Sequence, residues 1–325
     1  MAAGRARTVL LTGCNRGIGL ELVKQLLATP RPPAWVFATC RDPEGPRAQE
    51  LRDLASKHPN LVLVKLDISN PSAITDAAKI VEGKLDGLGL NLLINNAAIY
   101  TPTASLATAD AEDMINVYKT NTVGPMLMAQ AFLPLLKKAA KESTEKGLSC
   151  SRAAIINISS VMGSIQKTPE SFLKPVISYR CSKAALNMLT QCQALTYKAA
   201  GILCVALHPG WVKTDMGTQE AELTVDTSVR GLLSVLPILS EKHSGTLLNW
   251  EGKAIPWSRG NQNCRDLIRT WRSSAGVSFQ PEQLFILPSW LDPASCFLGK
   301  PPQSAVGGTM EVEALPAWHR FNPNT

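Results

Sequence analysis

A tyrosine and a lysine four positions apart are the residues of this 325-residue chain best suited to proton transfer. On a helix, Tyr179 and Lys183 would share one face, and residues 184–190 after them contain neither Gly nor Pro. A tyrosine hydroxyl has a pKa of about 10, and a neighbouring cation lowers that pKa. Such a tyrosine can exchange a proton with a carbonyl or alcohol oxygen near neutral pH. The same spacing also arises by coincidence on helix surfaces, so the surrounding sequence must supply the context.

A glycine-rich turn near the N-terminus predicts a phosphate-binding site. Residues 8–12 form a short apolar run typical of a buried strand, and residues 20–27 have the pattern of an amphipathic helix. Between them, Gly13, Gly17 and Gly19 have the spacing Gly-x-x-x-Gly-x-Gly, which differs from the common Gly-x-Gly-x-x-Gly. A strand, a glycine turn and a helix in this order present backbone N–H groups to a phosphate. A plain tight turn is the alternative interpretation.

The residues after the second expected strand, at 35–39, indicate which dinucleotide the chain binds. An NAD site carries an acidic residue about 20 positions beyond the glycines, where it binds the ribose hydroxyls. This chain has Arg41 in that region, and an arginine suits the 2′-phosphate of NADP, which Arg16 in the glycine turn could also contact. Asp42 follows directly, and a solvated loop charge is the alternative interpretation of Arg41. We therefore expect NADP (NADPH) as the cofactor.

Alternating strand and helix patterns continue to residue 250. Further strands are expected at 61–66, 90–94, 153–158, 202–207 and 245–250, and further helices at 49–56, 73–85, 110–139, from Tyr179 to Ala200 and at 226–239. This alternation predicts an α/β fold with a doubly wound (Rossmann-like) parallel sheet. Ligands of such sheets bind beyond the carboxyl ends of the strands, where polar residues should converge. These residues are Asp67, Asn95, Ser160 and the segment His208-Pro209-Gly210.

In this order the motifs resemble those of the short-chain dehydrogenases/reductases. The matching residues are Thr12-Gly13-x-x-x-Gly17-Ile18-Gly19, Asn95-Asn96-Ala97-Ala98, Asn121, Ser160, Tyr179-x-x-x-Lys183 and Pro209-Gly210. They lie within residues 8–257, about three quarters of the chain, and residues 245–257 are similar to the end of the C-factor and sniffer-type carbonyl reductases. The family usually has Gly at the position of Ala98. The loop at 162–177 is longer than in most members, and we expect it to extend over the substrate pocket.

The resemblance implies a role for each matched position. Tyr179 is expected to be the general acid/base, and Lys183 to lower its pKa and hold the nicotinamide ribose. Ser160 is expected to bind the substrate oxygen, with neighbouring Ser159 as the alternative. Asn121 is expected to hold a water in a proton relay, with a buried structural role as the alternative. The expected cofactor-binding residues are Gly13, Asn15, Arg16, Gly17, Ile18, Gly19, Arg41, Asp67, Ile68, Asn95, Ala97, Tyr179, Lys183, Pro209, Gly210, Val212 and Thr214. His208 is interpreted as a packed turn residue.

Composition narrows the classes of partner. A formal charge of +7 suits an anionic cofactor but is too small and too dispersed to indicate nucleic acid. No apolar run approaches the ~20 residues that span a membrane. The eight cysteines form no Cys-x-x-Cys pair and no zinc spacing, which indicates reduced thiols in a cytoplasmic protein without a metal site. Because family members commonly pair through the helix that carries the tyrosine, a homodimer is expected.

The last 68 residues do not fit the family pattern. We therefore expect a single catalytic domain at 1–257 and a C-terminal extension at 258–325 that is disordered or loosely docked. The function expected from the whole sequence is NADPH-dependent reduction of a ketone, aldehyde or quinone-like carbonyl to an alcohol. Two alternatives stay open, because a fold does not fix a function. One is a non-enzymatic dinucleotide-binding regulator, and the other is an enzyme that its own extension inactivates.

Overall fold

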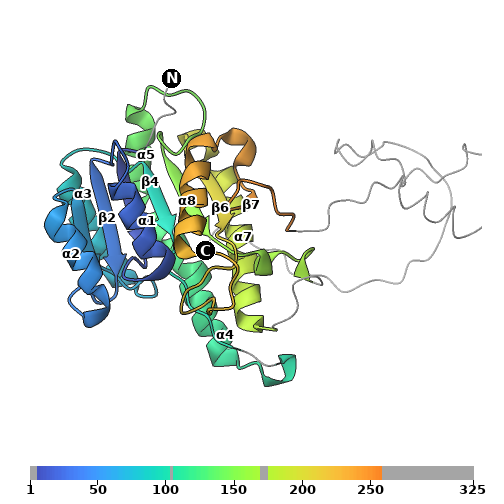
Figure 1. Ribbon diagram of the computed structural model, residues 1–325. Coiled ribbons are helices and arrows are strands. Elements are labelled where there is room, and N and C mark those ends of the chain that lie inside the picture. Colours follow the sequence, from blue (N-terminus) through green and yellow to red (C-terminus); the bar gives the residue numbers. More distant parts are fainter. Residues whose placement is uncertain (1–5, 103–104, 169–174, 258–325) are drawn as a thin grey trace, which may run out of the picture. The chain divides into compact units, whose positions relative to one another are not determined.

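The computed structural model describes residues 6–102, 105–168 and 175–257 (Figure 1). The expected extension at 258–325 lies outside the described residues, as does the middle of the expected loop at 162–177. No helix of the described part has the length and apolar character needed to cross a membrane. The six cysteines in that part are free thiols.

In the described part of the chain, seven strands form one parallel sheet in the order β3-β2-β1-β4-β5-β6-β7. The strands are β1 (Thr8–Thr12), β2 (Trp35–Cys40), β3 (Leu61–Lys65), β4 (Leu92–Asn95), β5 (Ala154–Ile158), β6 (Leu203–His208) and β7 (Leu247–Asn249). The chain first builds outward from β1 to β3 and then returns to β4 on the other side of β1. This change of direction creates the crevice in which such sheets bind ligands. The expected fold class, an α/β doubly wound parallel sheet, is confirmed.

Helices cover both faces of the sheet (Figure 1). Apolar residues of α1 (Gly17–Leu27), α2 (Gln49–Lys57) and α8 (Val225–Val235) form one core cluster with one face of the strands. Those of α3 (Pro71–Leu85), α5 (Gly124–Glu142) and α7 (Ile177–Tyr197) form the other cluster. Along β1, Val9 and Leu11 belong to the first cluster and Leu10 to the second. This alternation explains why the buried strands read as continuous apolar runs.

Two helical segments depart from the expected pattern. The stretch expected at 110–139 divides into α4 (Ala111–Tyr118) and α5, joined by a π-helical turn at Lys119–Val123 that carries Asn121. The helix expected at 226–239 ends as α-helix at Val235 and continues as a 3-10 turn. Pro237 explains that change, since proline has no backbone N–H and its ring clashes with the preceding turn.

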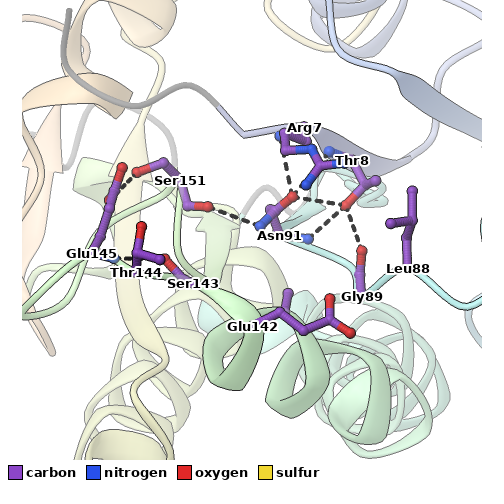
Figure 2. A pocket seen from close by; sticks show the side chains of 11 residues that line it. Arg7, Thr8, Leu88, Gly89, Asn91, Glu142, Ser143, Thr144, Glu145 and Ser151 are labelled. Atoms are coloured by element: carbon purple, nitrogen blue, oxygen red, sulfur yellow. Dashed lines mark hydrogen bonds between the residues drawn. The ribbon is translucent and has the colours of Figure 1, made fainter.

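Asn91 ties together the amino ends of three strands. Its Oδ1 accepts from the backbone N–H groups of Arg7 and Thr8, at 3.1 and 3.2 Å, and from the Thr8 hydroxyl at 3.1 Å. Its Nδ2 donates to the carbonyls of Ser151 and Arg152, at 2.8 and 3.0 Å. Figure 2 shows the bonds of Asn91 to Arg7, Thr8 and Ser151, which line a pocket together with Asn91. The side chain thus joins segments that enter β1, β4 and β5.

We predict that Asn91→Ala lowers the free energy of unfolding by about 2–4 kcal/mol, because each buried polar group left without a partner costs about 1–3 kcal/mol. Urea unfolding of the full chain measures the change. The matched control is Asn116→Ala on an exposed position of α4, where alanine is a slightly better helix former. Equal changes in the free energy of unfolding for the two substitutions would contradict the proposed role of Asn91 in stabilising the contact between the three segments.

Candidate active site

Tyr179 and Ser160 meet at the carboxyl edge of the sheet. Tyr179 lies on the first turn of α7 and is 9% exposed, and the Ser160 side chain lies near enough to lower the pKa of its hydroxyl. Ser160 follows β5 and also accepts the backbone N–H of Met162 at 3.1 Å. Because its oxygen already accepts that bond, the Ser160 hydroxyl proton is available to the tyrosine or to a ligand oxygen.

Strand alternation separates Ser160 from its neighbour Ser159. The Ser159 hydroxyl donates to Asn187 Oδ1 on α7 at 2.7 Å and is buried beneath the helix. Successive side chains of an extended segment point to opposite sides, so only one of the two serines can reach the tyrosine hydroxyl. The structure places Ser160 beside Tyr179, and its catalytic role stays a prediction.

Lys183 lies one turn after Tyr179 and is 2% exposed. Its Nζ is 5.6 Å from the centre of the Tyr179 ring and donates to the carbonyl of Ile158 at 2.8 Å. Burial lowers the pKa of Lys183 to about 7. Burial also raises the pKa of Tyr179 to about 12, although the nearby Ser160 side chain opposes it. The expected lowering of the Tyr179 pKa by Lys183 is not seen in this structure, where burial dominates and raises that pKa.

The Asn121 side chain is committed to contacts within the protein. Its Oδ1 accepts the backbone N–H of Ile99 and its Nδ2 donates to the carbonyl of Ile99, both at 2.9 Å. The same Nδ2 donates to the hydroxyl of Ser182 on α7 at 3.1 Å. These bonds fit the structural alternative for the side chain. They leave the backbone of the π-helical turn as the part able to hold a water, and such turns are frequent at functional sites.

The glycine turn has the shape that a phosphate requires. Gly13 and Gly17 have φ angles of +71° and +53°, which side chains rarely adopt. A Cβ at Gly19 would lie 2.1 Å from the Gly13 carbonyl oxygen, so α1 can approach the turn only with glycine at that position. Arg16 precedes α1 in an extended conformation and provides no side-chain cap. The first N–H groups of α1 are thus free of a capping side chain and fit a phosphate.

The other glycine-turn residues lie beside this opening. Asn15 and Ile18 are half-buried, and Gly13 packs against Ala97. Thr12 Oγ1 accepts the backbone N–H groups of both Asn96 and Ala97 at 3.0 Å, which fixes the end of β4 next to the turn. Ala98 has no positive φ, so replacing the family's glycine there causes no backbone strain.

Arg41 and Asp67 mark the half of the crevice beyond β2 and β3. Arg41 is exposed and Ile68 is buried. Burial raises the pKa of Asp67, but hydrogen bonds from Ser69 and the charges of Arg41 and Lys119 outweigh it, so the pKa lies below its ordinary value. The electrostatic effect of Arg41 on Asp67 shows that the two expected adenosine-side residues are near each other.

Asn95 is an expected cofactor-binding residue, but its side chain is engaged in a hydrogen bond within the sheet. Its Nδ2 donates to Asn157 Oδ1 on β5 at 2.9 Å, and its Oδ1 is buried without a partner in the described part. The side chain is 3% exposed between strands. Only its backbone could therefore contact a bound cofactor.

The segment after β6 provides the opposite half of the crevice. Gly210 has a φ of +86°, and a Cβ there would lie 2.3 Å from Leu223. The carbonyl of Pro209 accepts the Ser228 hydroxyl at 2.6 Å. Val212 pairs with Leu223 in an isolated bridge and is buried. Thr214 reaches the glycine turn, where its methyl group would lie 3.4 Å from a Cβ at Gly17.

Sequence reasoning missed Tyr100 and Asp215 in this region and assigned His208 no role beyond packing. The ring of Tyr100 meets that of Tyr179 edge-on, with centroids 5.5 Å apart. Asp215 forms an ion pair with Arg16. Burial, and then the charge of Lys183, lowers the pKa of His208 to about 4, so the imidazole is neutral beside the lysine. Tyr100 lies two positions after the Asn-Asn-Ala-Ala motif, and this position was the one sequence feature that could have indicated a place near the site. Within the described ranges, no group of three His, Cys, Asp or Glu could hold a metal.

Comparisons with known proteins agree with this geometry. The family model described as short chain dehydrogenase matches residues 7–224. C-signal from Myxococcus xanthus is 34% identical over 168 residues, covering 52% of this chain and 93% of C-signal. The solved structure of NADPH-bound carbonyl reductase from chicken fatty liver is 59% identical, with a TM-score of 0.75, covering 78% of this chain and 100% of that chain. Carbonyl reductase Sniffer of D. melanogaster is 42% identical, with a TM-score of 0.74 and the same coverage.

We predict opposite effects for the same substitution at two helical glycines. Gly19→Ala forces a Cβ against the Gly13 carbonyl and Asn96 Nδ2, and overpacking of this kind costs about 1–3 kcal/mol or more. Gly83→Ala on α3 meets nothing within 4 Å and should stabilise the chain by about 0.5–1 kcal/mol, because alanine is the better helix former. Urea unfolding compares the two, and a neutral Gly19→Ala would disprove the close approach.

The buried Lys183 predicts a pH-dependent stability. Its pKa is about 7 in the folded chain and about 10.4 when unfolded. Between these values the unfolded state binds more protons, so the free energy of unfolding rises with pH. Burial of the charged Lys183 amine destabilises the folded chain fully below its folded pKa, and this destabilisation is gone above its unfolded pKa. We expect the parent chain to gain stability over Lys183→Met from about pH 7 to about pH 8.5, measured by urea unfolding. A constant difference between the two chains would refute this.

Proposed function

Because this chain belongs to the short chain dehydrogenase family, we propose that it is an NADPH-dependent reductase that converts a ketone, aldehyde or quinone-like carbonyl to an alcohol. Membership of the family and a carbonyl reductase-like enzyme class are established. The observation that carries the finer proposal is the placement of Ser160 beside the Tyr179 hydroxyl, with Lys183 one turn further along α7 and its Nζ 5.6 Å from the Tyr179 ring centre. The NADPH named in the description of the chicken structure supports the choice of cofactor.

The residues available to hold NADPH surround the crevice from both sides. The uncapped N-terminus of α1 would bind the pyrophosphate, and Arg41 would bind the 2′-phosphate. Asp67 and Ile68 would line the adenosine half, and Pro209, Gly210, Val212 and Thr214 the nicotinamide half. When bound, NADPH supplies the hydride for the reduction.

Tyr179 would deliver the proton that the reduced carbonyl oxygen requires. Ser160 lies beside its hydroxyl, and a pKa raised to about 12 by burial keeps it protonated at neutral pH. A protonated phenol in a dry site is a hydrogen-bond donor to developing negative charge. Ser160 would give a second hydrogen bond to the same oxygen, since its own oxygen already accepts from Met162.

Lys183 would set the charge of the site and replenish the proton. With a pKa of about 7, its amine gains and loses a proton near neutral pH. As an ammonium it lowers the free energy of the tyrosinate that proton donation leaves behind. The backbone of the π-helical turn at Asn121 would hold the water that connects this lysine to solvent.

A homodimer is proposed on the outer face of α7. Met188 and Leu195 are 54% and 70% exposed there, although both are large apolar side chains. Apolar residues on a second face of a helix indicate a contact beyond the core. Light scattering of the full chain tests the proposal, and a monomer at micromolar concentration would reject it. Cytoplasmic localisation stays a prediction from the cysteine content.

We predict that Tyr179→Phe reduces turnover by about 100-fold or more, because general acid catalysis contributes that much, while NADPH affinity stays nearly unchanged. Fluorescence titration with NADPH and NADH measures binding, and a screen of carbonyl substrates measures turnover. Ser160→Ala should lose turnover in the same way. A Tyr179→Phe chain as active as the parent would overturn the assignment of the general acid.

The same measurements separate the two alternatives. A regulator would bind NADPH tightly and reduce no carbonyl in the screen. An enzyme inactivated by its extension would gain activity when the chain is cut after Trp257. A parent chain that binds neither dinucleotide would reject the proposed function altogether.

A further inference from the structure

Two tyrosines that are far apart in the sequence meet at the candidate active site. Tyr100 lies shortly after the end of β4, and Tyr179 lies on the first turn of α7. Their ring centroids are 5.5 Å apart and their planes are inclined by 72°, which is an edge-on contact. This arrangement is one that the quadrupoles of two aromatic rings favour. The ring of Tyr100 therefore limits the directions in which the Tyr179 side chain can tilt.

The backbone beside Tyr100 is fixed by Asn121. The Asn121 side chain accepts the N–H of Ile99 and donates to the carbonyl of Ile99, both at 2.9 Å. Asn121 is buried, so water competes little for these two bonds. Because Tyr100 directly follows Ile99, a braced segment of backbone presents its ring to Tyr179.

The same amide is also connected to the backbone of Tyr179. Asn121 Nδ2 donates to the Ser182 hydroxyl at 3.1 Å, and that hydroxyl donates to the carbonyl of Tyr179 at 2.8 Å. Ser182 is fully buried. These hydrogen bonds link the backbones next to the two rings through one side chain. The positions of Tyr100 and Tyr179 relative to each other are therefore determined both by the backbone and by the ring contact.

A small displacement of the Tyr179 ring would matter for catalysis. A general acid must lie within hydrogen-bond reach of the oxygen that it protonates, and a misplacement of about 1 Å can lower a rate by about 100-fold. Lys183 Nζ lies 5.6 Å from the ring centre, and Ser160 lies beside the hydroxyl. Tyr100 adds to these two neighbours an aromatic ring in direct contact with that of Tyr179.

We propose that Tyr100 is a positioning residue for the reduction, whose ring, braced through Asn121, keeps the Tyr179 hydroxyl where it can protonate the carbonyl oxygen. This inference rests on the proposed function, because it requires Tyr179 to be the general acid. The ring of Tyr100 carries the role, and its own hydroxyl is dispensable, since the contact is between the rings. Tyr100 acts through Tyr179, so its loss lowers turnover more than the affinity for NADPH or for the carbonyl.

The test measures steady-state kinetics of the full chain with NADPH and three carbonyl probes. The probes are p-nitrobenzaldehyde, acetophenone and menadione, which represent an aldehyde, a ketone and a quinone. Tyr100→Ala should lower kcat by about 2- to 10-fold, the effect expected from the loss of one aromatic pair, with the KM for the carbonyl nearly unchanged. Tyr100→Phe keeps the ring and should retain the kcat of the parent.

A second background separates positioning from a general loss of stability. In Tyr179→Phe the hydroxyl to be positioned is absent, so adding Tyr100→Ala should lower the residual turnover no further. The matched control is Tyr118→Ala on α4, where the tyrosine is 46% exposed, and it should leave kcat unchanged. Tyr100→Leu, which keeps apolar bulk without a flat ring, should also lower kcat, and it replaces the alanine variant if that variant does not fold.

Three results would overturn the proposal. They are a kcat of Tyr100→Ala equal to that of Tyr118→Ala, a Tyr100→Phe chain as impaired as Tyr100→Ala, and an equal loss from Tyr100→Ala in the parent and in Tyr179→Phe. A raised KM with kcat unchanged would make Tyr100 a substrate contact and would also overturn it. A parent chain that reduces none of the three carbonyls would instead reject the proposed function, and this inference with it.

Discussion

A buried row of hydrogen bonds between the sheet and α7 determines where the candidate active site forms. Asn157 on β5 donates to Thr190 and Gln193 of the helix, both at 2.9 Å, and Ser159 donates to Asn187. Polar groups in a core must find their partners, so they specify one arrangement where apolar packing would tolerate several. A helix shifted by one turn would leave these groups unpaired. These hydrogen bonds thus fix the position of α7 along the sheet, and with it the placement of Tyr179 beside Ser160.

The same burial that fixes the helix sets the chemistry of its first turns. Lys183 is surrounded by protein and has one carbonyl partner, that of Ile158, so its charged form is only marginally favoured at neutral pH. Tyr179 and His208 are driven toward their neutral forms for the same reason. Three titratable groups at one strand edge thus have pKa values shifted by burial. Groups with perturbed pKa values cluster at functional sites, because catalytic acids and bases need pKa values matched to their task.

Much of the fold followed from the sequence because buried parallel strands leave continuous apolar runs, and helices between them keep a regular period. The choice of Ser160 over Ser159 was also within reach of motif spacing. Three other features could not be predicted from the sequence. The π-helical turn at Asn121 depends on how two helices meet, the use of Asn95 depends on its neighbour across the sheet, and the pairing of Arg16 with Asp215 depends on the order of the strands. Each is a contact between distant segments, for which local sequence carries no signal.

Inherited substitutions at the two edges of the sheet should affect the protein in different ways. Asn91 fastens the amino edge, whereas Tyr179, Ser160 and the glycine turn occupy the carboxyl edge. A substitution at Asn91 would act through the fraction of chains that unfold and are degraded, since a change of about 1–2 kcal/mol alters cellular abundance several-fold. A cell carrying such a variant would hold fewer molecules, each with the catalytic rate of the parent. Raising expression would compensate for that loss, but it would do little for a variant that disables the opposite edge.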